Sequence, residues 1–437
     1  MTKAPVHGTR LRSLQALGIF CGFAAGAWLG GAEAPIKLVN PNISPITVSF
    51  IMVFGVFLAR WSVPAFIRGT SHVRHDVGQA PHLIVWAVLA GGMWAVANTL
   101  TIYAIRDVGL SIAFPLWNTN SLLGIFWGFL LFNELHYAGW KRWLGVLGGA
   151  ICMFGGATLL AIASSHQAAP GKAAFGIAAA LGAGILWGTM YIPYRKAYLT
   201  GMNPLSFITF FTVGELSTMT VLAITYRGAT PLWNELVSAR PVLFWLMLGG
   251  FVWVIGDLFQ QYATKYVGIS RGVPLSNTNQ LWGLLWGVLV FHELRGGTHR
   301  LYAQVAGGSL LMALGAVAIA LSSATEREHG AWQDAAQREG DRYGVEGEYV
   351  RAGMEGREMA SISGAKGAEK SRAPVSGRTA LDWLLILSAT AIFAVLALLA
   401  KFPQLDIAWS WAAALTLAMI VLLAIGGFAL WRTTRFR

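Results

Sequence analysis

Most of this chain consists of long apolar runs separated by short polar segments. Only 12% of its 437 residues are charged, whereas a soluble domain carries about a quarter. A run of about 20 apolar residues can cross roughly 30 Å of hydrocarbon. It must be helical there, because lipid offers the backbone no hydrogen bonds. The sequence therefore predicts an all-α membrane protein with spans at approximately 12–31, 45–67, 82–105, 109–132, 143–164, 173–194, 204–226, 241–264, 267–291, 302–322, 380–401 and 407–431.

Two segments of the chain repeat each other without a gap. Residues 91–135 and 250–294 lie 159 positions apart and are identical at about 20 of 45 positions. The matches include the run Pro-Leu-x-Asn-Thr-Asn, and Trp94 corresponds to Trp253. Matches of proline, asparagine and tryptophan exceed what two apolar helices share by chance, so they indicate an internal duplication.

The duplication divides most of the chain into two halves, residues 1–165 and 166–322, with five predicted spans in each. An odd number of spans turns the second copy upside down relative to the first. We therefore expect an inverted repeat of 5+5 transmembrane helices, an architecture typical of secondary transporters that bind substrate near the membrane midplane. The alternative from another class is a duplicated membrane assembly protein that transports nothing.

The remainder of the chain lies outside the repeats. Residues 323–379 are rich in Gly, Ala, Glu and Arg and have few apolar side chains, so we predict a disordered cytoplasmic linker. Residues 380–437 hold two further apolar runs that match nothing in the halves. They predict a C-terminal transmembrane hairpin used in packing or assembly.

Basic residues between the spans predict the orientation. Short cytoplasmic loops of membrane proteins are rich in Lys and Arg, and this asymmetry places both termini in the cytoplasm of a multi-pass protein of the cell inner membrane. The basic N-terminus and first apolar run imitate a signal peptide, but we expect the run to be retained because it has a counterpart in the second half. The basic residues on the predicted cytoplasmic side of the first half are Lys3, Arg10, Arg12, Arg68, Arg74, Lys141 and Arg142.

Among the ionisable residues inside predicted spans, three stand out, namely Arg60, Glu215 and Asp257. Such residues are expensive in lipid and are commonly functional. Asp257 aligns with Asn98, so an acid in the second half replaces an amide in the first. Asp257 and Glu215 are therefore candidates for proton coupling, with Asp257 a candidate sugar ligand as well. The alternative is a structural ion pair in which Arg60 is the partner of either acid.

Helical spacing places several further polar and aromatic residues on one face. Trp94 and Asn98 are four residues apart, as are Trp253, Asp257 and Gln261 in turn, so each set lies on one side of its helix. Aromatic rings beside amide and carboxylate groups suit sugars, whose C–H faces pack on rings while their hydroxyls form hydrogen bonds. These residues are predicted to line a substrate site. The alternative is that the tryptophans fill gaps between helices.

The repeated asparagines suggest two roles. Asn118 and Asn120 lie roughly 200° apart on an ideal helix, so both cannot face one cavity unless the helix unwinds. We predict that Asn118 and its counterpart Asn277 line the substrate site, while Asn120 and its counterpart tie helices together along a stripe of glycines. Glu134, which closes its span, is expected to be solvated or to cap a helix.

Other function classes find little support in the sequence. The two cysteines, Cys21 and Cys152, lie within apolar runs, and the histidines lack ligand spacing, so we predict no metal, no cofactor and no catalytic residues. The net charge of +12 is scattered between spans, which argues against nucleic acid as a partner. The chain is therefore not expected to be an enzyme.

The run Trp94…Asn98…Tyr103, followed by Val-Gly-Leu-Ser, a proline and a glycine-containing helix that ends near Glu134, resembles the bacterial glucose/ribose porter and rhamnose–proton symporter families. Both belong to the drug/metabolite transporter superfamily. The resemblance covers about residues 10–322 and implies a ten-helix inverted repeat, cytoplasmic termini and sugar uptake driven by an ion gradient. The linker and the terminal helix pair depart from the family pattern.

These observations lead to one prediction with stated alternatives. The chain is predicted to be a secondary transporter of a small polar solute, with monosaccharide uptake by alternating access as the leading interpretation and a metabolite or drug exporter as the alternative. Its expected partners are a sugar, protons as the candidate coupling ion, and the lipid bilayer, with a homo-oligomer as a candidate assembly. The predicted substrate-binding residues are Trp94, Asn98, Asn118, Trp253, Gln261 and Asn277.

Overall fold

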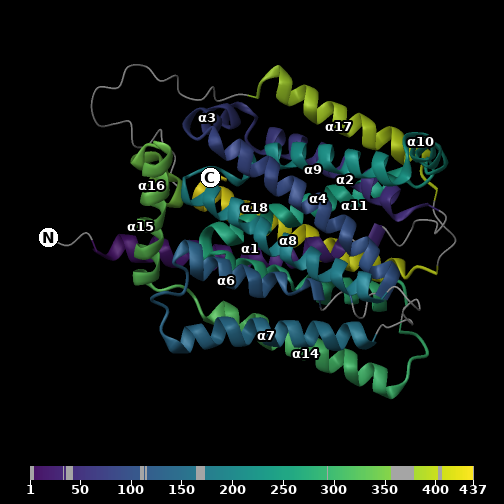
Figure 1. Ribbon diagram of the computed structural model, residues 1–437, viewed down its shortest axis with the longest axis horizontal. Coiled ribbons are helices and arrows are strands. Elements are labelled where there is room, and N and C mark those ends of the chain that lie inside the picture. The colour runs from purple at the N-terminus through teal and green to yellow at the C-terminus, as the bar shows by residue number, and fades with distance from the viewer. Residues whose placement is uncertain are drawn as a thin grey trace.

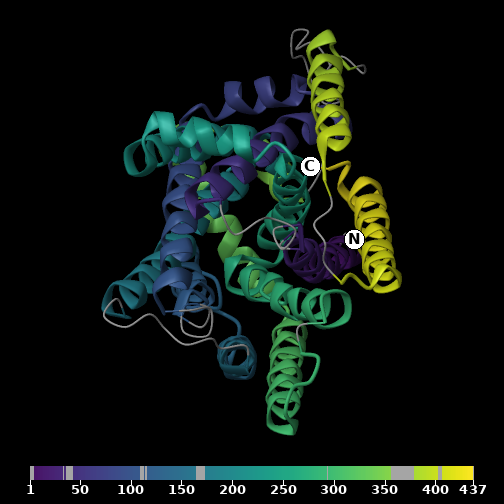
Figure 2. The same cartoon turned by 90° about the vertical axis from the view of Figure 1, so that its right-hand side faces the viewer.

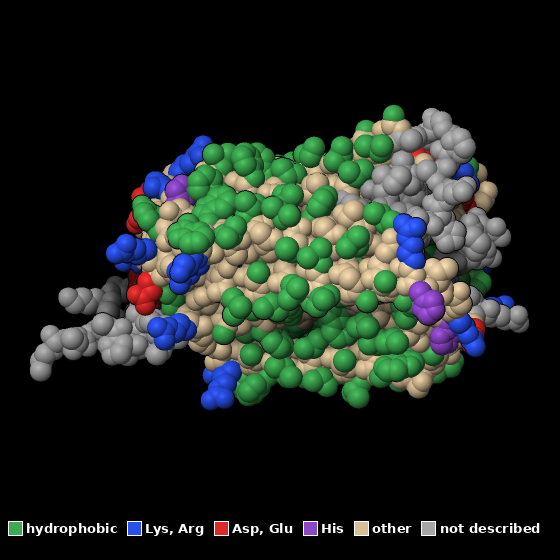
Figure 3. Space-filling view, turned by 90° about the horizontal axis from the view of Figure 1, so that it is seen from below, with side chains coloured by type: hydrophobic (Ala, Val, Ile, Leu, Met, Phe, Trp, Pro, Cys, Tyr) green, Lys and Arg blue, Asp and Glu red, His purple; other side chains and the backbone are tan. Residues whose placement is uncertain are grey.

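The computed structural model describes residues 4–32, 34–35, 43–108, 113, 116–163, 173–292, 294–355, 378–401 and 406–436. Ten helices of this part of the chain are long and apolar enough to cross a membrane. Hydrophobic side chains cover the middle of the face in Figure 3, with lysine and arginine side chains toward its two ends. The structure thus confirms the all-α, multi-pass membrane class.

The helices of the first half are α1 (Ala4–Gly31), α2 (Pro45–Ile67), α3 (Ser71–Gln79), α4 (His82–Val108), α6 (Asn120–Phe132) and α7 (Trp140–Ala163). Those of the second half are α8 (Ala173–Leu199), α9 (Pro204–Arg227), α10 (Ala229–Ser238), α11 (Leu243–Val267), α12 (Ile269–Ser276), α13 (Asn279–Leu285), the π-helical turn η2 (Trp286–Val290) and α14 (His299–Leu321). They are followed by α15 (Glu326–Tyr343), α16 (Gly347–Glu355), α17 (Ala380–Leu399) and α18 (Trp409–Thr434).

Equivalent helices in the two halves begin in the same way. Ser44 caps α2 by accepting a hydrogen bond from the Thr47 amide, and Asn203 caps α9 by accepting one from the Leu205 amide. A proline follows each cap at the first helical position, where its missing N–H costs no hydrogen bond. These starts lie 159 residues apart, as do the repeated segments.

The two halves are interleaved in space. α4 packs against α8 and α9, while α11 packs against α1 and α2. The helices α7 and α14 pair with each other along one edge, as Figure 1 shows. The short helices α3 and α10 lie at opposite ends of the long helices. α4 and α11 therefore each pack mainly against helices of the other half.

Two predicted spans are not continuous helices, which corrects the sequence prediction. The segment 267–291 is divided into α12, α13 and η2, with a turn at Asn277 and Thr278. Pro274 cannot donate a helical hydrogen bond, and the Thr278 hydroxyl donates to the Leu275 carbonyl at 2.8 Å in place of a backbone amide four residues on.

The corresponding segment of the first half is interrupted in the same way. Thr119, the counterpart of Thr278, donates its hydroxyl to the Leu116 carbonyl at 2.7 Å, and α6 begins only at Asn120. Residues 109–112 and 114–115 of the predicted span lie outside the described part of the chain. The repeated Asn-Thr pair thus ends a helix in both halves.

The segment after α14 also differs from the prediction. A disordered linker was predicted over 323–379, but α15 and α16 are helices that pack against the body. Residues 356–377 lie outside the described residues. Buried Trp332 and Tyr349 explain the packing, since each removes a large apolar surface from water despite the polar composition around it.

The last two helices do not pack together as a simple hairpin. α17 lies on α2 and α11, whereas α18 lies on α1 and η2. Figure 2 shows α17 and α18 on separate parts of the body. The Trp28 indole in α1 donates to the Met419 carbonyl in α18 at 3.0 Å, so this contact with the body is specific.

Close approach of α7 and α14 depends on glycine. A methyl group on Gly149 would lie 2.7 Å from the Gly315 carbonyl oxygen, whereas one on neighbouring Gly148 would meet nothing within 4 Å. We therefore expect Gly149→Ala to reduce the free energy of unfolding by about 1–3 kcal/mol. The matched control Gly148→Ala should leave stability unchanged or raise it by up to about 1 kcal/mol. Thermal unfolding in detergent micelles would measure both, and equal effects would contradict the close packing.

Candidate functional site

An arginine and two acids meet in the centre of the membrane body. Arg60 of α2 lies 2.8 Å from Asp257 Oδ2 of α11 and 3.7 Å from Glu215 Oε2 of α9. All three side chains are fully buried, and each lies near the middle of its helix. Arg60 thus pairs with Asp257 and lies near Glu215, which is the arrangement of the alternative interpretation, a buried ion pair.

Aromatic rings surround the guanidinium group. Arg60 Cζ lies 4.0 Å from the centre of the Phe211 ring and 5.3 Å from that of Trp253. These are cation–π distances. Trp253 in turn meets Trp94 edge to face, with ring centres 5.0 Å apart. The two counterpart tryptophans predicted for the substrate site therefore touch each other beside the charged cluster.

Several polar atoms of the cluster are buried without a hydrogen-bond partner among the described residues. They are both carboxylate oxygens of Glu215, Oδ1 of Asp257, and Nε and Nη1 of Arg60. A buried polar atom without a partner costs about 1–3 kcal/mol. These donor and acceptor atoms are available for hydrogen bonds with further polar groups.

Gln261 extends the cluster toward one end of α11. Its amide nitrogen donates to Asp257 Oδ2 at 2.7 Å, and its amide oxygen accepts from the Tyr198 hydroxyl of α8. Gln261 therefore lies beside Asp257, as its helical spacing predicts. Tyr198 was not anticipated, because no spacing rule connects α8 with α11.

The positions that the sequence repeat relates to this cluster are uncharged. Positions 159 residues away from Arg60 and Asp257 are Met219 and Asn98. The Asn98 amide donates to the Ser49 hydroxyl at 2.5 Å, and that hydroxyl lies 3.8 Å from the Met219 sulfur. The two copies of the repeat thus differ in charge at both pairs of positions, Arg60 and Met219, and Asp257 and Asn98.

The predicted asparagine pair lies elsewhere. Asn118 is buried at the turn before α6. Asn277 donates its amide to the Ser121 hydroxyl at 2.5 Å and to the Asn120 oxygen at 3.3 Å, which ties the α12–α13 turn to α6. The interhelical tie predicted for Asn120 therefore exists, and Asn277 is its partner rather than a neighbour of Asp257.

A second buried charge network was not predicted. Glu134 is fully buried rather than solvated; it pairs with Arg195 at 2.9 Å and accepts hydrogen bonds from the Ile269 and Ser270 amides at the start of α12. Its predicted capping role is confirmed, although it caps a helix of the other half. Arg271 within an apolar run was the signal that could have indicated this network.

Metal binding requires several ligands at one place. Within the described ranges, no three His, Cys, Asp or Glu side chains gather in a way that could hold a metal ion. The buried acids of the centre are paired with arginine instead.

Comparison with known proteins adds a family resemblance. A family described as sugar transport protein matches residues 178–340, which is less than half of the chain. A Streptococcus pyogenes serotype M1 protein named "Putative sugar uptake protein" is 54% identical over 87 residues, which are 18% of this chain and 30% of that protein. This match thus spans about a third of the relative's length.

Two longer matches are more distant. The glucose uptake protein GlcU of Staphylococcus xylosus is 22% identical over 216 residues, covering 48% of this chain and 69% of that protein. A "Putative sugar uptake protein" of Listeria innocua serovar 6a is 22% identical over 238 residues, covering 54% of this chain and 77% of its own. The chain is therefore similar to proteins named for sugar uptake, and the family match includes the segment that carries Glu215, Asp257 and Gln261.

Proposed function

We propose that the protein is a secondary transporter that takes up a monosaccharide by alternating access, with Asp257 as its proton-binding group. The observation that carries the proposal is the buried Arg60–Asp257–Glu215 cluster beside the Trp94–Trp253 pair. It combines charge, spare hydrogen-bonding atoms and aromatic faces where helices of both halves meet. The similarity to proteins named for sugar uptake supports the substrate class.

An inverted repeat of 5+5 helices is the proposed scaffold, with residues 1–165 and 166–322 as its two units. Reciprocal contacts support it. A methyl group on Gly91 would lie 1.9 Å from the Phe211 carbonyl oxygen, and one on its counterpart Gly250 would lie 2.1 Å from that of Met52, the counterpart of Phe211. Such an exchange of contacts is what a two-fold axis between the units requires.

The positions of the short helices support inversion of the second unit. α3 and α10 follow the second span of their respective units, yet they lie at opposite ends of the molecule. A two-fold axis in the membrane plane would place them so. With the basic loops of the first unit facing the cytoplasm, both termini lie on the cytoplasmic side of the inner membrane in this proposal.

The charge count of the cluster supports proton coupling. Arg60 supplies one positive charge against the two carboxyl groups of Asp257 and Glu215, so this set is neutral only when one carboxyl group holds a proton. Moving an excess charge through a low-dielectric body is costly. Rearrangement of the loaded transporter is therefore favoured when sugar and proton are bound together.

The proposal assigns sugar contacts by position. Trp94 and Trp253 offer aromatic faces to C–H groups, while Asn98 and Gln261 offer amides beside Asp257. Asn118 and Asn277 lie at the helix breaks of the two units and are proposed to line the route of the solute as these turns move. Residues of this kind bind and release a solute without forming covalent bonds, so transport is proposed rather than catalysis.

The proposal predicts saturable sugar uptake by the purified protein in proteoliposomes. With an outside-acid gradient, a monosaccharide from a panel of hexoses, pentoses and deoxysugars should accumulate, and a protonophore should abolish the accumulation. Empty liposomes and the Asp257→Asn variant are the controls. Absence of saturable uptake for every sugar, with binding of none, would reject sugar transport and leave the assembly role.

The direction of transport distinguishes this proposal from the alternative, an exporter of the same architecture. An exporter would confer resistance to toxic compounds or deplete a preloaded solute from vesicles when the gradient is reversed. The proposal expects entry of sugar to depend on the gradient and efflux of unrelated drugs to be unaffected. Uptake by a homo-oligomer would give the same result, so subunit number is measured separately by light scattering.

A further inference from the structure

The helices α15 and α16, here called the cap, lie across the end of the body that also carries α3 and the start of α1, as Figure 1 shows. Both are helices outside the candidate spans. The Gln15 side chain of α1 donates to the Ala324 carbonyl just before α15 at 2.7 Å. The Tyr349 hydroxyl of α16 donates to Asp76 of α3 at 2.8 Å. The cap is thus fixed to elements of the first half.

A buried ion pair fixes the cap to the second half as well. Nη1 and Nη2 of Arg271 in α12 donate to the two carboxylate oxygens of Glu328 in α15, at 2.8 and 3.0 Å. The Leu135 amide donates to the same carboxylate at 2.8 Å. The Arg271 and Glu328 side chains are 1% and 0% exposed, so bulk water does not reach the pair. Two-point pairing of this kind is strong and geometrically specific.

The electrostatics of Glu328 keep this pair charged. Burial alone would raise the pKa of Glu328, but the Arg271 charge and the hydrogen bonds from Arg271 and the Leu135 amide outweigh it, so the pKa lies below its ordinary value. The pair with Arg271 therefore stabilises the protein at neutral pH, and this stabilisation is lost only as the pH falls through the lowered pKa of Glu328.

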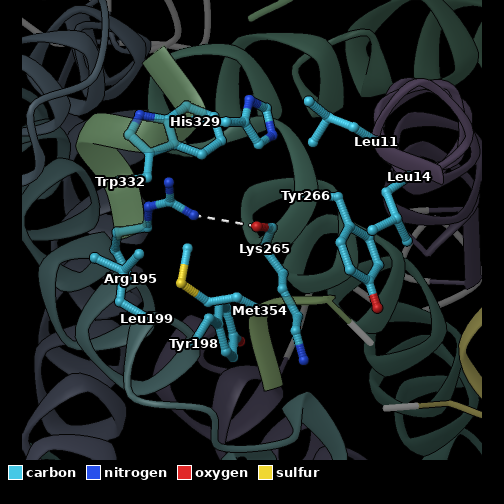
Figure 4. Close-up of a pocket in the computed structure, with 10 residues that line it drawn as sticks. All are labelled: Leu11, Leu14, Arg195, Tyr198, Leu199, Lys265, Tyr266, His329, Trp332 and Met354. Atoms are coloured by element: carbon cyan, nitrogen blue, oxygen red, sulfur yellow. Dashed lines mark hydrogen bonds between the residues drawn. The ribbon is translucent and has the colours of Figure 1, made fainter. Parts of the chain in front are cut away.

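The cap also covers a small cavity of the body. The cavity has a volume of about 30 Å³, and Figure 4 shows Arg195, Tyr198 and Lys265 of the body facing His329, Trp332 and Met354 of the cap. Trp332 is almost fully buried, with the Arg195 guanidinium 4.5 Å from its ring centre.

Tyr198 connects this cavity with the proposed transport site. Its hydroxyl donates to Gln261, which itself donates to Asp257. A continuous line of contacts therefore runs from Asp257 through Gln261 and Tyr198 to the space beneath Trp332. The cap occupies the end of that line, where a solute or proton leaving Asp257 in this direction would emerge.

We propose that the cap is a gate of the transporter, and that the Arg271–Glu328 pair is the latch that holds it closed. The role of the cap in transport rests on the proposed function, whereas the latch itself does not depend on it. Rocking of the two halves against each other must release the cap from one of them, because it is fixed to both. Separation of the latch is possible only when water reaches its charges, which links opening of this end to hydration of the cavity.

The first test measures access to the cavity and does not depend on transport. Leu199 lines the cavity and is 2% exposed, so Leu199→Cys in a Cys21→Ala, Cys152→Ser background reports on opening. We expect Glu328→Gln to raise the rate of labelling by a charged maleimide by about tenfold or more, because one half of a buried pair is removed. The control Glu346→Gln changes an exposed acid of the cap and should leave the rate unchanged.

Two outcomes of this test would overturn the gate. Labelling of the Glu328→Gln protein at the parent rate would show that the pair is no latch. Labelling of the parent at the rate of an exposed cysteine would show that the cap does not close the cavity. Circular dichroism of each variant in micelles shows whether it is folded, and a misfolded variant is replaced by Arg271→Gln.

The second test locks the cap in place. Lys196 of α8 and Glu339 of α15 form a partly exposed pair at 2.5 Å, away from the buried latch. A cleavable cross-linker between Lys196→Cys and Glu339→Cys should reduce sugar uptake by about tenfold or more, and a reducing agent should restore it. Undiminished uptake by the cross-linked protein would overturn the gate. If the uncross-linked protein binds and transports no sugar, the proposed function fails, while labelling at Leu199→Cys still decides on the latch.

Discussion

Replacement of Asp257 by asparagine is expected to abolish proton-driven accumulation of sugar while sugar exchange continues at a comparable rate. Asparagine is the residue that the first half carries at the equivalent position, Asn98, so the substitution uses a side chain that this scaffold already accommodates. It keeps the size of the side chain and a hydrogen-bond acceptor for Arg60 and Gln261. It removes the negative charge of the side chain and with it the ability to bind and release a proton, while Glu215 remains as a carboxyl group near Arg60.

The expected magnitude follows from the gradient. One pH unit is worth about 1.4 kcal/mol for each proton, so one-to-one coupling supports about tenfold accumulation of sugar. The Asp257→Asn protein should stop at a ratio of about one. Exchange of labelled for unlabelled sugar at equal pH measures whether the site still binds and turns over.

A surface acid provides the control for this prediction. Asp406 is 81% exposed and lies 3.6 Å from Arg295, a pair of little energetic weight. Asp406→Asn should accumulate sugar as the parent does. If Asp257→Asn accumulates as well, Asp257 is not the coupling group, and Glu215→Gln becomes the variant to examine. Loss of both accumulation and exchange would assign Asp257 to sugar binding instead.

Much of the membrane body could be predicted because one physical rule governs it. Lipid forces an apolar run into a helix, so ten of the predicted spans are helices. The position of Asp257 between Trp253 and Gln261 followed from the helical period alone. The broken spans were only partly predicted. Pro274 indicates an interruption of the helix, but the break also involves the hydrogen bond from the Thr278 hydroxyl to the Leu275 carbonyl, which the sequence alone does not predict.

The second charge network could not be predicted from spacing. Glu134, Arg195, Arg271 and Glu328 come from four separate segments, and no period in the sequence relates them. The cap was missed for another reason. Its composition is typical of disorder, but the run Thr325-x-x-Glu328 is a helix start signal. The Thr325 hydroxyl caps α15, whereas the Glu328 side chain is used for Arg271.

Replacement of Arg60 by methionine is expected to destabilise the protein more than any other single change considered. It leaves Asp257 and Glu215 fully buried without a cation, and removal of one partner of a buried pair costs about 3–5 kcal/mol. Methionine is the counterpart residue, Met219, so its shape is tolerated in this scaffold. Thermal unfolding in detergent micelles should show the loss, whereas Arg60→Lys should retain part of the stability.

The residues at the repeat-related positions supply the rescue. The counterparts of Arg60, Glu215 and Asp257 are Met219, Val56 and Asn98. The triple variant Arg60→Met, Glu215→Val, Asp257→Asn therefore copies the uncharged arrangement onto the charged side. Its free energy of unfolding should lie within about 1–2 kcal/mol of that of the parent, because well-packed neutral groups often replace buried ions without loss of stability. If the triple variant is no more stable than Arg60→Met alone, unpaired charge is not the cause of the instability.

The triple variant separates stability from function. If the charged cluster served only to hold α2, α9 and α11 together, a stable uncharged copy would transport sugar as the parent does. We expect instead a folded protein that accumulates none against a gradient, since no titrating group remains in the cluster. A triple variant as stable as the parent would show that Arg60 of α2, Glu215 of α9 and Asp257 of α11 are not kept for stability alone. In the proposed transporter, these charges serve a step that needs a proton at one of the two repeat-related sites only.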